Sequence, residues 1–166
     1  MDPASSDLIP MTAAALLALL ALASLVLAWI DFRRGIIPDW LNLFIALAGL
    51  VQAWLLDGWG AALSAVLDGL MIGAIVFALR WAYFRFRGHQ GLGLGDVKLL
   101  AASAVWVGVA GIPMQLLVGS VTALTAAVAL HVMGHTMSRQ TALPFGPFLA
   151  LGLLATLALQ QQGWVV

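Results

Sequence analysis

From Leu8 to Ile30 the chain has no charged residue, and most of its side chains there are apolar. A helix needs about 20 predominantly apolar residues to cross the hydrocarbon layer of a bilayer, and this stretch is long enough. The residues before it include Asp2 and Asp7 but no basic side chain. A cleavable signal peptide has a basic first region and a shorter apolar core. We therefore expect a first transmembrane helix that is retained.

Five further apolar runs follow, separated by short polar or glycine-containing segments. The second run closes at Asp57–Gly58 and the fourth at Gly111-Ile112-Pro113. Hydrophobic residues make up 63 % of the chain and charged residues 8 %, against about 25 % charged residues in soluble domains. The sequence predicts an all-α membrane protein, a single domain over residues 1–166, with six transmembrane helices. Their expected bounds are about 8–30, 38–56, 61–84, 97–112, 114–133 and 144–159.

Basic residues predict the orientation, because cytoplasmic loops carry an excess of lysine and arginine. With six helices, all seven basic residues fall at one face, if the long side chains near helix ends extend toward it. Both termini and the loop at Asp57 then lie on the outer side. The seven residues are Arg33, Arg34, Arg80, Arg85, Arg87, Lys98 and Arg139.

Composition excludes several classes of function. The net charge is zero, so the chain lacks the basic footprint of a nucleic-acid-binding protein. It has no cysteine, which excludes disulfides, cysteine-based zinc sites and thiol nucleophiles. His131 and His135 have the four-residue spacing of a metal pair, but neither a glutamate between them nor a third ligand is evident. We expect no metal and no cofactor.

Three carboxylates lie at one predicted depth on the cytoplasmic side. Asp31 follows the inward-running first helix, whereas Asp39 and Asp96 stand at the inner starts of the second and fourth helices. Asp96 is preceded by Gly91, Gly93 and Gly95, which lack side-chain bulk and let another backbone come close. A carboxylate inside a membrane segment is costly and commonly functional. These observations suggest that Asp96 is half of a catalytic pair whose glycines make room for a peptide.

Two aspartates at one site hydrolyse a peptide by sharing a proton. The ionised member takes a proton from water, and the protonated member polarises the scissile carbonyl. Simpler interpretations remain open at this point. Asp39 and Asp96 are well placed to cap helix starts, and Asp31 could pair with Arg33 or Arg34.

Three segments carry a resemblance to the type IV prepilin leader peptidases. Residues 31–39, Asp-Phe-Arg-Arg-Gly-Ile-Ile-Pro-Asp, look like the family's Asp-then-Pro-Asp segment. Residues 93–102, Gly-Leu-Gly-Asp-Val-Lys-Leu-Leu-Ala-Ala, resemble its GxGD motif and the helix after it. Residues 144–152, Pro-Phe-Gly-Pro-Phe-Leu-Ala-Leu-Gly, are similar to the proline-glycine segment that opens its last helix. The three matches occur in the family's order.

The resemblance implies an intramembrane aspartic endopeptidase of the bacterial inner membrane, with its active site facing the cytoplasm. Its partners would be the lipid bilayer and a prepilin or pseudopilin, cleaved between a short basic leader and a hydrophobic helix. Asp31 and Asp96 match the two catalytic aspartates, and Asp39 matches an acidic neighbour. Other expected site-supporting residues are Gln90, Gly93, Gly95, Lys98, Pro144 and Gly146.

The chain departs from the family in two places. Full-length members carry an extra N-terminal cytoplasmic region with paired cysteines, linked to methylation of the new N-terminus. This chain has no cysteine and no such region, so we expect no methyl transfer. Gln90 stands where members often carry glutamate, which removes one charge beside Asp96.

Two other functions compete with the peptidase. A small ion-coupled transporter could use Asp68, Asp31 and Asp96 as a relay, but would be expected to spread carboxylates over several depths. A non-catalytic membrane subunit of a pilus or secretion machine is the second. Both aspartates and the glycine loop are retained, which favours the peptidase. The oligomeric state does not follow from the sequence.

Overall fold

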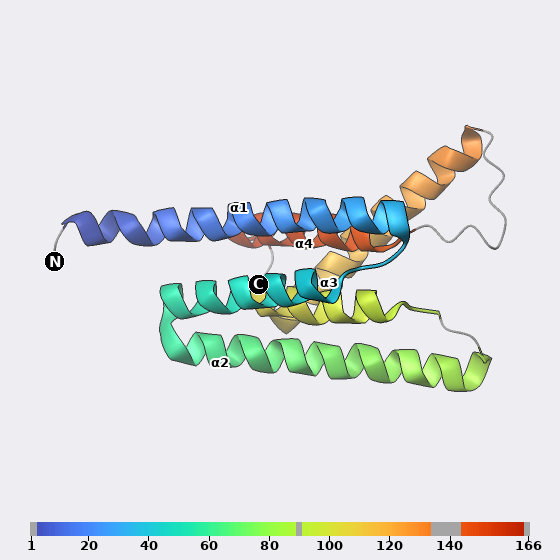
Figure 1. Ribbon diagram of the computed structural model, residues 1–166, viewed down its shortest axis with the longest axis horizontal. Coiled ribbons are helices and arrows are strands. Elements are labelled where there is room, and N and C mark those ends of the chain that lie inside the picture. The colour runs from blue at the N-terminus through green and yellow to red at the C-terminus, as the bar shows by residue number, and fades with distance from the viewer. Residues whose placement is uncertain (1–2, 89–90, 134–143, 165–166) are drawn as a thin grey trace.

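A computed structural model describes residues 3–88, 91–133 and 144–164, and their side chains from residue 11 onward. The all-α prediction is confirmed, since these residues form helices and no strand. The helices are α1 (Pro3–Arg34), α2 (Asp39–Arg87), α3 (Leu94–Val132) and α4 (Gly146–Gln161). Most of the helical segments lie roughly along one long axis, with α1 and α4 side by side, whereas the C-terminal part of α3 runs obliquely to them (Figure 1).

The described residues form four helices rather than six separate ones, because two of the helices contain a glycine break. Within α2, Gly58 has φ 80° and ψ −170°, and Figure 1 shows the two halves of α2 lying antiparallel on either side of this turn. Within α3, Gly108 has φ 66° and ψ 174°, and the helix changes direction sharply there. Both conformations belong to a region that is essentially restricted to glycine.

The predicted break at Gly58 is therefore in the right place, whereas the one at Gly111-Ile112-Pro113 is wrong. Pro113 lies inside the helix that follows Gly108. Proline removes one backbone hydrogen bond but keeps a helical φ, so it need not turn the chain. A glycine with positive φ reverses the backbone at once. α1 extends beyond its predicted bounds of 8–30 at both ends, to Pro3–Arg34. α4, at Gly146–Gln161, begins and ends two residues later than the predicted 144–159.

The core is an apolar seam between the helices. α3 packs against α2 and α4, and α1 packs against α2 and α4. Polar groups within the seam are partly satisfied by the protein itself: Gln115 donates from Nε2 to Ser103 Oγ (2.9 Å) and to the Leu149 carbonyl (3.1 Å). In the described part of the chain, no Cα atom of α1 lies within 8 Å of a Cα atom of α3. Any site that uses both helices must therefore bridge a gap between them.

Three of the four helices are long and apolar enough to cross a membrane, namely those that contain Met11–Arg34, Asp39–Arg87 and Leu94–Val132. α4 is a shorter apolar helix. Much of the large apolar surface faces outward, including Trp59 and Leu70, as lipid contact requires. These helices indicate an integral membrane protein.

Candidate active site

Asp31 stands at the end of the buried stripe of α1. Leu20, Ala23, Leu27 and Asp31 follow helical spacing, and the carboxylate residue is only 5 % exposed. Its Oδ2 accepts a hydrogen bond at 3.0 Å from the backbone N–H of Gly146, the first residue of α4. The first amides of a helix have no partner within the helix, so the carboxylate supplies one. A Cβ atom at Gly146 would lie 2.6 Å from this oxygen, and only glycine leaves room for it.

The alternative partner for Asp31, an arginine of the following turn, is not used within the described part of the chain. Arg33 instead places its guanidinium carbon 4.5 Å from the centre of the Trp29 ring. The one ion pair found among the described residues lies elsewhere. Asp31 is thus held by a backbone amide and not by a neighbouring charge.

Asp96 lies in the first turn of α3 and has two roles at once. Gly93 is the residue that precedes the helix, and its N–H donates a hydrogen bond to the Asp96 carboxylate. This is the backward half of a capping box, so the capping interpretation is correct for Asp96. A Cβ atom at Gly93 would lie 3.1 Å from Asp96 Oδ2. The same carboxylate lines the cavity described below, and capping does not remove it from chemistry.

The glycine loop is packed against the protein itself. A Cβ atom at Gly91 would lie 2.7 Å from Cε1 of Tyr83, and one at Gly95 would lie 2.9 Å from Cβ of Ile37. Arg80 donates from Nε to the Leu92 carbonyl at 2.8 Å. The glycines allow close approach here, but the approaching atoms belong to side chains of α2 and of the α1–α2 connection. These contacts set the position of Asp96. The room that the glycines were expected to make for a peptide backbone stays a prediction.

Asp39 and Lys98 form a surface pair beside the loop. Lys98 Nζ lies 2.7 Å from Asp39 Oδ1, with the side chains 48 % and 73 % exposed. An exposed pair of this kind contributes little stability. Because it joins the start of α2 to the first turns of α3, it orients the two helix starts relative to each other.

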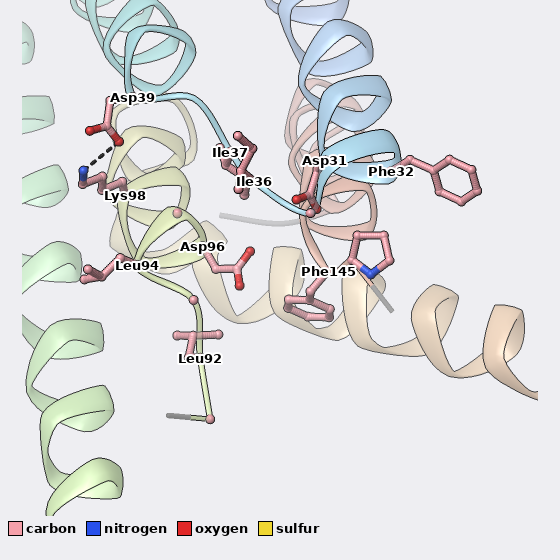
Figure 2. Close-up of a pocket in the computed structure, with 15 residues that line it drawn as sticks. Asp31, Phe32, Ile36, Ile37, Asp39, Leu92, Leu94, Asp96, Lys98 and Phe145 are labelled. Atoms are coloured by element: carbon pink, nitrogen blue, oxygen red, sulfur yellow. Dashed lines mark hydrogen bonds and ion pairs between the residues drawn. The ribbon is translucent and has the colours of Figure 1, made fainter. Parts of the chain in front are cut away.

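These residues surround one cavity of about 920 Å³, and Figure 2 shows Asp31 and Asp96 on opposite sides of it. α1 supplies Asp31 and Phe32, α3 supplies Asp96, and the segments before α2 and α4 contribute Ile37 and Phe145. The gap between α1 and α3 is thus the cavity itself. It is large enough for an extended peptide, with one carboxylate near each wall.

The structure brings most of the predicted site residues together. Asp31, Asp39, Gly93, Gly95, Asp96, Lys98 and Pro144 line the cavity, and Gly146 binds Asp31. Gln90 and His135 lie outside the described residues.

Asp68 does not belong to this cavity. Its Oδ2 would lie 3.5 Å from a Cβ atom at Gly108, beside the break in α3. A relay through Asp68, Asp31 and Asp96 therefore has no shared cavity in the described structure.

Sequence reasoning missed Ile37, Phe145 and Tyr83. Tyr83 is the only tyrosine of the chain, which is weak evidence in the sequence for a specific role. Ile37 precedes Pro38 and Phe145 follows Pro144. Both are apolar, and neither residue type by itself indicates a functional site. Among the described residues no group of three or more histidines and acids could hold a metal ion.

Comparison with known proteins places this geometry in a family context. Residues 18–128 match the model of the type IV leader peptidase family. The chain is 38 % identical over 140 residues to a prepilin leader peptidase/N-methyltransferase of Burkholderia pseudomallei, which covers 83 % of this chain and 44 % of that protein. No solved structure gives a significant match.

Two further relatives carry the same description. The protein of Aeromonas hydrophila is 34 % identical over 138 residues, covering 78 % of this chain and 47 % of the relative. That of Escherichia coli K12 is 35 % identical over 136 residues, covering 80 % and 58 %. The chain thus spans about half the length of these curated relatives. With a family match over most of its length, the chain belongs to the type IV leader peptidase family.

Proposed function

We propose that this chain is an intramembrane aspartic endopeptidase that removes the leader peptide of prepilins or pseudopilins. The observation that carries the proposal is the pair formed by Asp31 and Asp96. The two carboxylates come from helices whose Cα atoms stay more than 8 Å apart in the described structure, line one cavity, and are each bound by a backbone amide. Membership of the family and the names of its relatives supply the substrate class.

The chemistry follows from a peptide bound between the two walls. One carboxylate, ionised, takes a proton from a water molecule as the water oxygen attacks the scissile carbonyl carbon. The other carboxyl, protonated, donates its proton to the carbonyl oxygen. When the tetrahedral intermediate collapses, the carbon–nitrogen bond breaks, the leaving amine takes the proton that the first aspartate received from water, and a hydroxyl of the intermediate returns its proton to the second aspartate. The two aspartates end with one proton between them, as they began.

The proposed orientation places this cavity at the cytoplasmic face of a bacterial inner membrane, in a bundle of six membrane-crossing segments with both termini outside. The turns at Gly58 and Gly108 support six segments, since each divides one long helix into two. Lys98, which lines the cavity, and Arg80, which binds the carbonyl of its lining residue Leu92, support a cytoplasmic face. Asp31, Asp39 and Asp96 outnumber Lys98 among the cavity's charged residues, which suits a cationic leader.

The test is cleavage of a purified prepilin by the purified protein, compared with three matched substitutions. Asp31→Asn and Asp96→Asn are each expected to lower kcat roughly 10²- to 10⁴-fold, because each removes one half of the acid–base pair. Asp57→Asn changes an exposed carboxylate beside the Gly58 turn and is expected to cleave at the parent rate. Full activity of either Asp31→Asn or Asp96→Asn, or no cleavage by the parent, would refute the proposal.

A further inference from the structure

The surface of α1 carries a second stripe beside the buried one. Leu25, Ala28, Trp29 and Phe32 follow the same helical spacing but lie on an outer face, where Leu25 is 68 % and Phe32 73 % exposed. The buried stripe ends at Asp31 and the outer stripe at Phe32, one residue later. An apolar track along α1 therefore ends next in sequence to the carboxylate, on a neighbouring face of the helix.

This track forms one wall of a groove of about 530 Å³, completed by Pro147 near the start of α4. All of its lining side chains are apolar. They are Leu25, Val26, Ala28, Trp29, Phe32 and Pro147.

The groove adjoins the candidate active site at Phe32, whose ring points away from the two aspartates (Figure 2). Phe32 lines both the groove and the cavity. On the α4 side, Pro147 directly follows Gly146, whose N–H binds Asp31. The lining thus changes from entirely apolar in the groove to one that includes three aspartates and one lysine in the cavity. A ligand that lies across this boundary needs an apolar segment on one side and a polar, cationic segment on the other.

We propose that the groove between α1 and α4 receives the apolar membrane helix of the substrate, while the leader lies in the acidic cavity. This inference rests on the proposed peptidase function and adds a docking surface to it. Two features of the groove favour a helix that continues into the cavity over a lipid chain. The groove shares Phe32 with the cavity that holds the carboxylates, and the Arg33 guanidinium over Trp29 marks the level at which the apolar part ends.

Crosslinking tests the location. A photoreactive phenylalanine analogue replaces Leu25 in the Asp96→Asn background, which holds the substrate uncleaved. The matched control places it at Leu63, an exposed leucine (55 %) of a separate apolar groove on α2. Illumination with a full-length prepilin is expected to give a covalent complex from position 25 and none from position 63. Adducts with lipid alone at position 25, or equal prepilin crosslinking at both positions, would overturn the inference.

Kinetics separates the groove from the chemistry. Leu25→Trp and Leu63→Trp are compared on a full-length prepilin and on a short peptide that spans the cleavage junction but lacks most of the apolar helix. The ratio of kcat/KM for the full substrate to that for the peptide is expected to fall roughly tenfold in Leu25→Trp, a loss of about 1.4 kcal/mol in binding. It should stay at the parent value in Leu63→Trp.

The two proposals fail in different ways. If the parent protein cleaves neither substrate, the peptidase function is wrong. If it cleaves both and Leu25→Trp leaves the ratio unchanged, the peptidase function stands and the docking groove is wrong.

Discussion

The side chain of Asp31 depends on one residue from the far end of the chain. Asp31 lies at the C-terminal end of α1, where its charge has the wrong sign for the dipole of its own helix. The structure resolves this by turning it toward the first amide of α4, so that Gly146 Nα–H and Asp31 Oδ2 meet at 3.0 Å. The carboxylate then faces the positive end of a different helix. Its position is set by backbone atoms, which move less than side chains do.

A methyl group at Gly146 should therefore impair the reaction specifically. In Gly146→Ala the new Cβ would lie 2.6 Å from Asp31 Oδ2 and 2.9 Å from Cδ1 of Ile37, so the carboxylate must move. We expect kcat for prepilin cleavage to fall roughly 100-fold, as a displacement of about 1 Å at a catalytic group commonly does. Helix content should be unchanged, since alanine favours helices.

Gly60→Ala is the matched control for this substitution, because nothing lies within 4 Å of a Cβ atom at Gly60. It should retain the parent kcat. Equal activity of Gly146→Ala and Gly60→Ala would contradict the role given to the Asp31–Gly146 contact. Circular dichroism of both variants in detergent distinguishes a displaced carboxylate from a misfolded protein.

At this scale the sequence identified most of the residues around the cavity but few of their contacts. The Asp96–Gly93 contact is local, spanning three positions, and helix-capping rules predict it. The Asp31–Gly146 contact joins residues 115 positions apart, and no local rule connects them. The resemblance named both residues without stating that they touch. The Lys98–Asp39 pair is likewise a long-range contact that charge alone did not assign.

At the scale of elements, the apolar runs predicted the helical content but located only one of the two helix breaks correctly. Apolar runs predicted how much of the chain is helical, because lipid-exposed backbone must satisfy its own hydrogen bonds. They did not locate the turn in α3, since Gly108 and Pro113 lie within the same apolar stretch. The carbonyl of Val107, left without its helical partner at the break, accepts a hydrogen bond from Gln160 Nε2 at 3.0 Å. That contact comes from α4, so the local sequence pattern of α3 does not predict it.

The break in α3 should be sensitive to Gly108 and tolerant at Pro113. Gly108→Ala places a Cβ atom in a backbone conformation with φ 66° and ψ 174°, at a cost on the order of 1–3 kcal/mol. Its midpoint of thermal unfolding in detergent should fall. Pro113→Ala restores a backbone N–H inside the helix, and its midpoint should stay the same or rise. The reverse ranking of the two variants would show that the proline, and not the glycine, determines the turn.

At the scale of the whole molecule, the site draws on all four helices. Asp31 lies in the last turn of α1, Asp39 begins α2 and Asp96 lies in the first turn of α3 (Figure 2). Gly146 begins α4. In the described structure the Cα atoms of α1 and α3 stay more than 8 Å apart, whereas both helices pack closely against α2 and α4. α2 and α4 therefore set the relative position of α1 and α3. This arrangement gathers helix ends at one end of the bundle. Because the site residues lie at helix ends, the positions of the charged residues and of the apolar runs in the sequence predict the depth of the site in the membrane. The width of the cavity depends on how the helices pack, which these sequence patterns do not predict.

The orientation of that end relative to the membrane is the last prediction. The chain contains no cysteine, so single-cysteine variants report accessibility without background labelling. Phe86→Cys, 87 % exposed at the end of α2 near the cavity, should react with a membrane-impermeant maleimide only in inverted inner-membrane vesicles. Trp59→Cys, 77 % exposed at the opposite turn of α2, and Ser5→Cys, near the N-terminus, should react only in spheroplasts, where the outer face is accessible.

Labelling of Phe86→Cys in spheroplasts would place the aspartates on the outer face and contradict leader removal in the cytoplasm. Labelling of Trp59→Cys and Phe86→Cys from the same side would contradict two membrane crossings by α2.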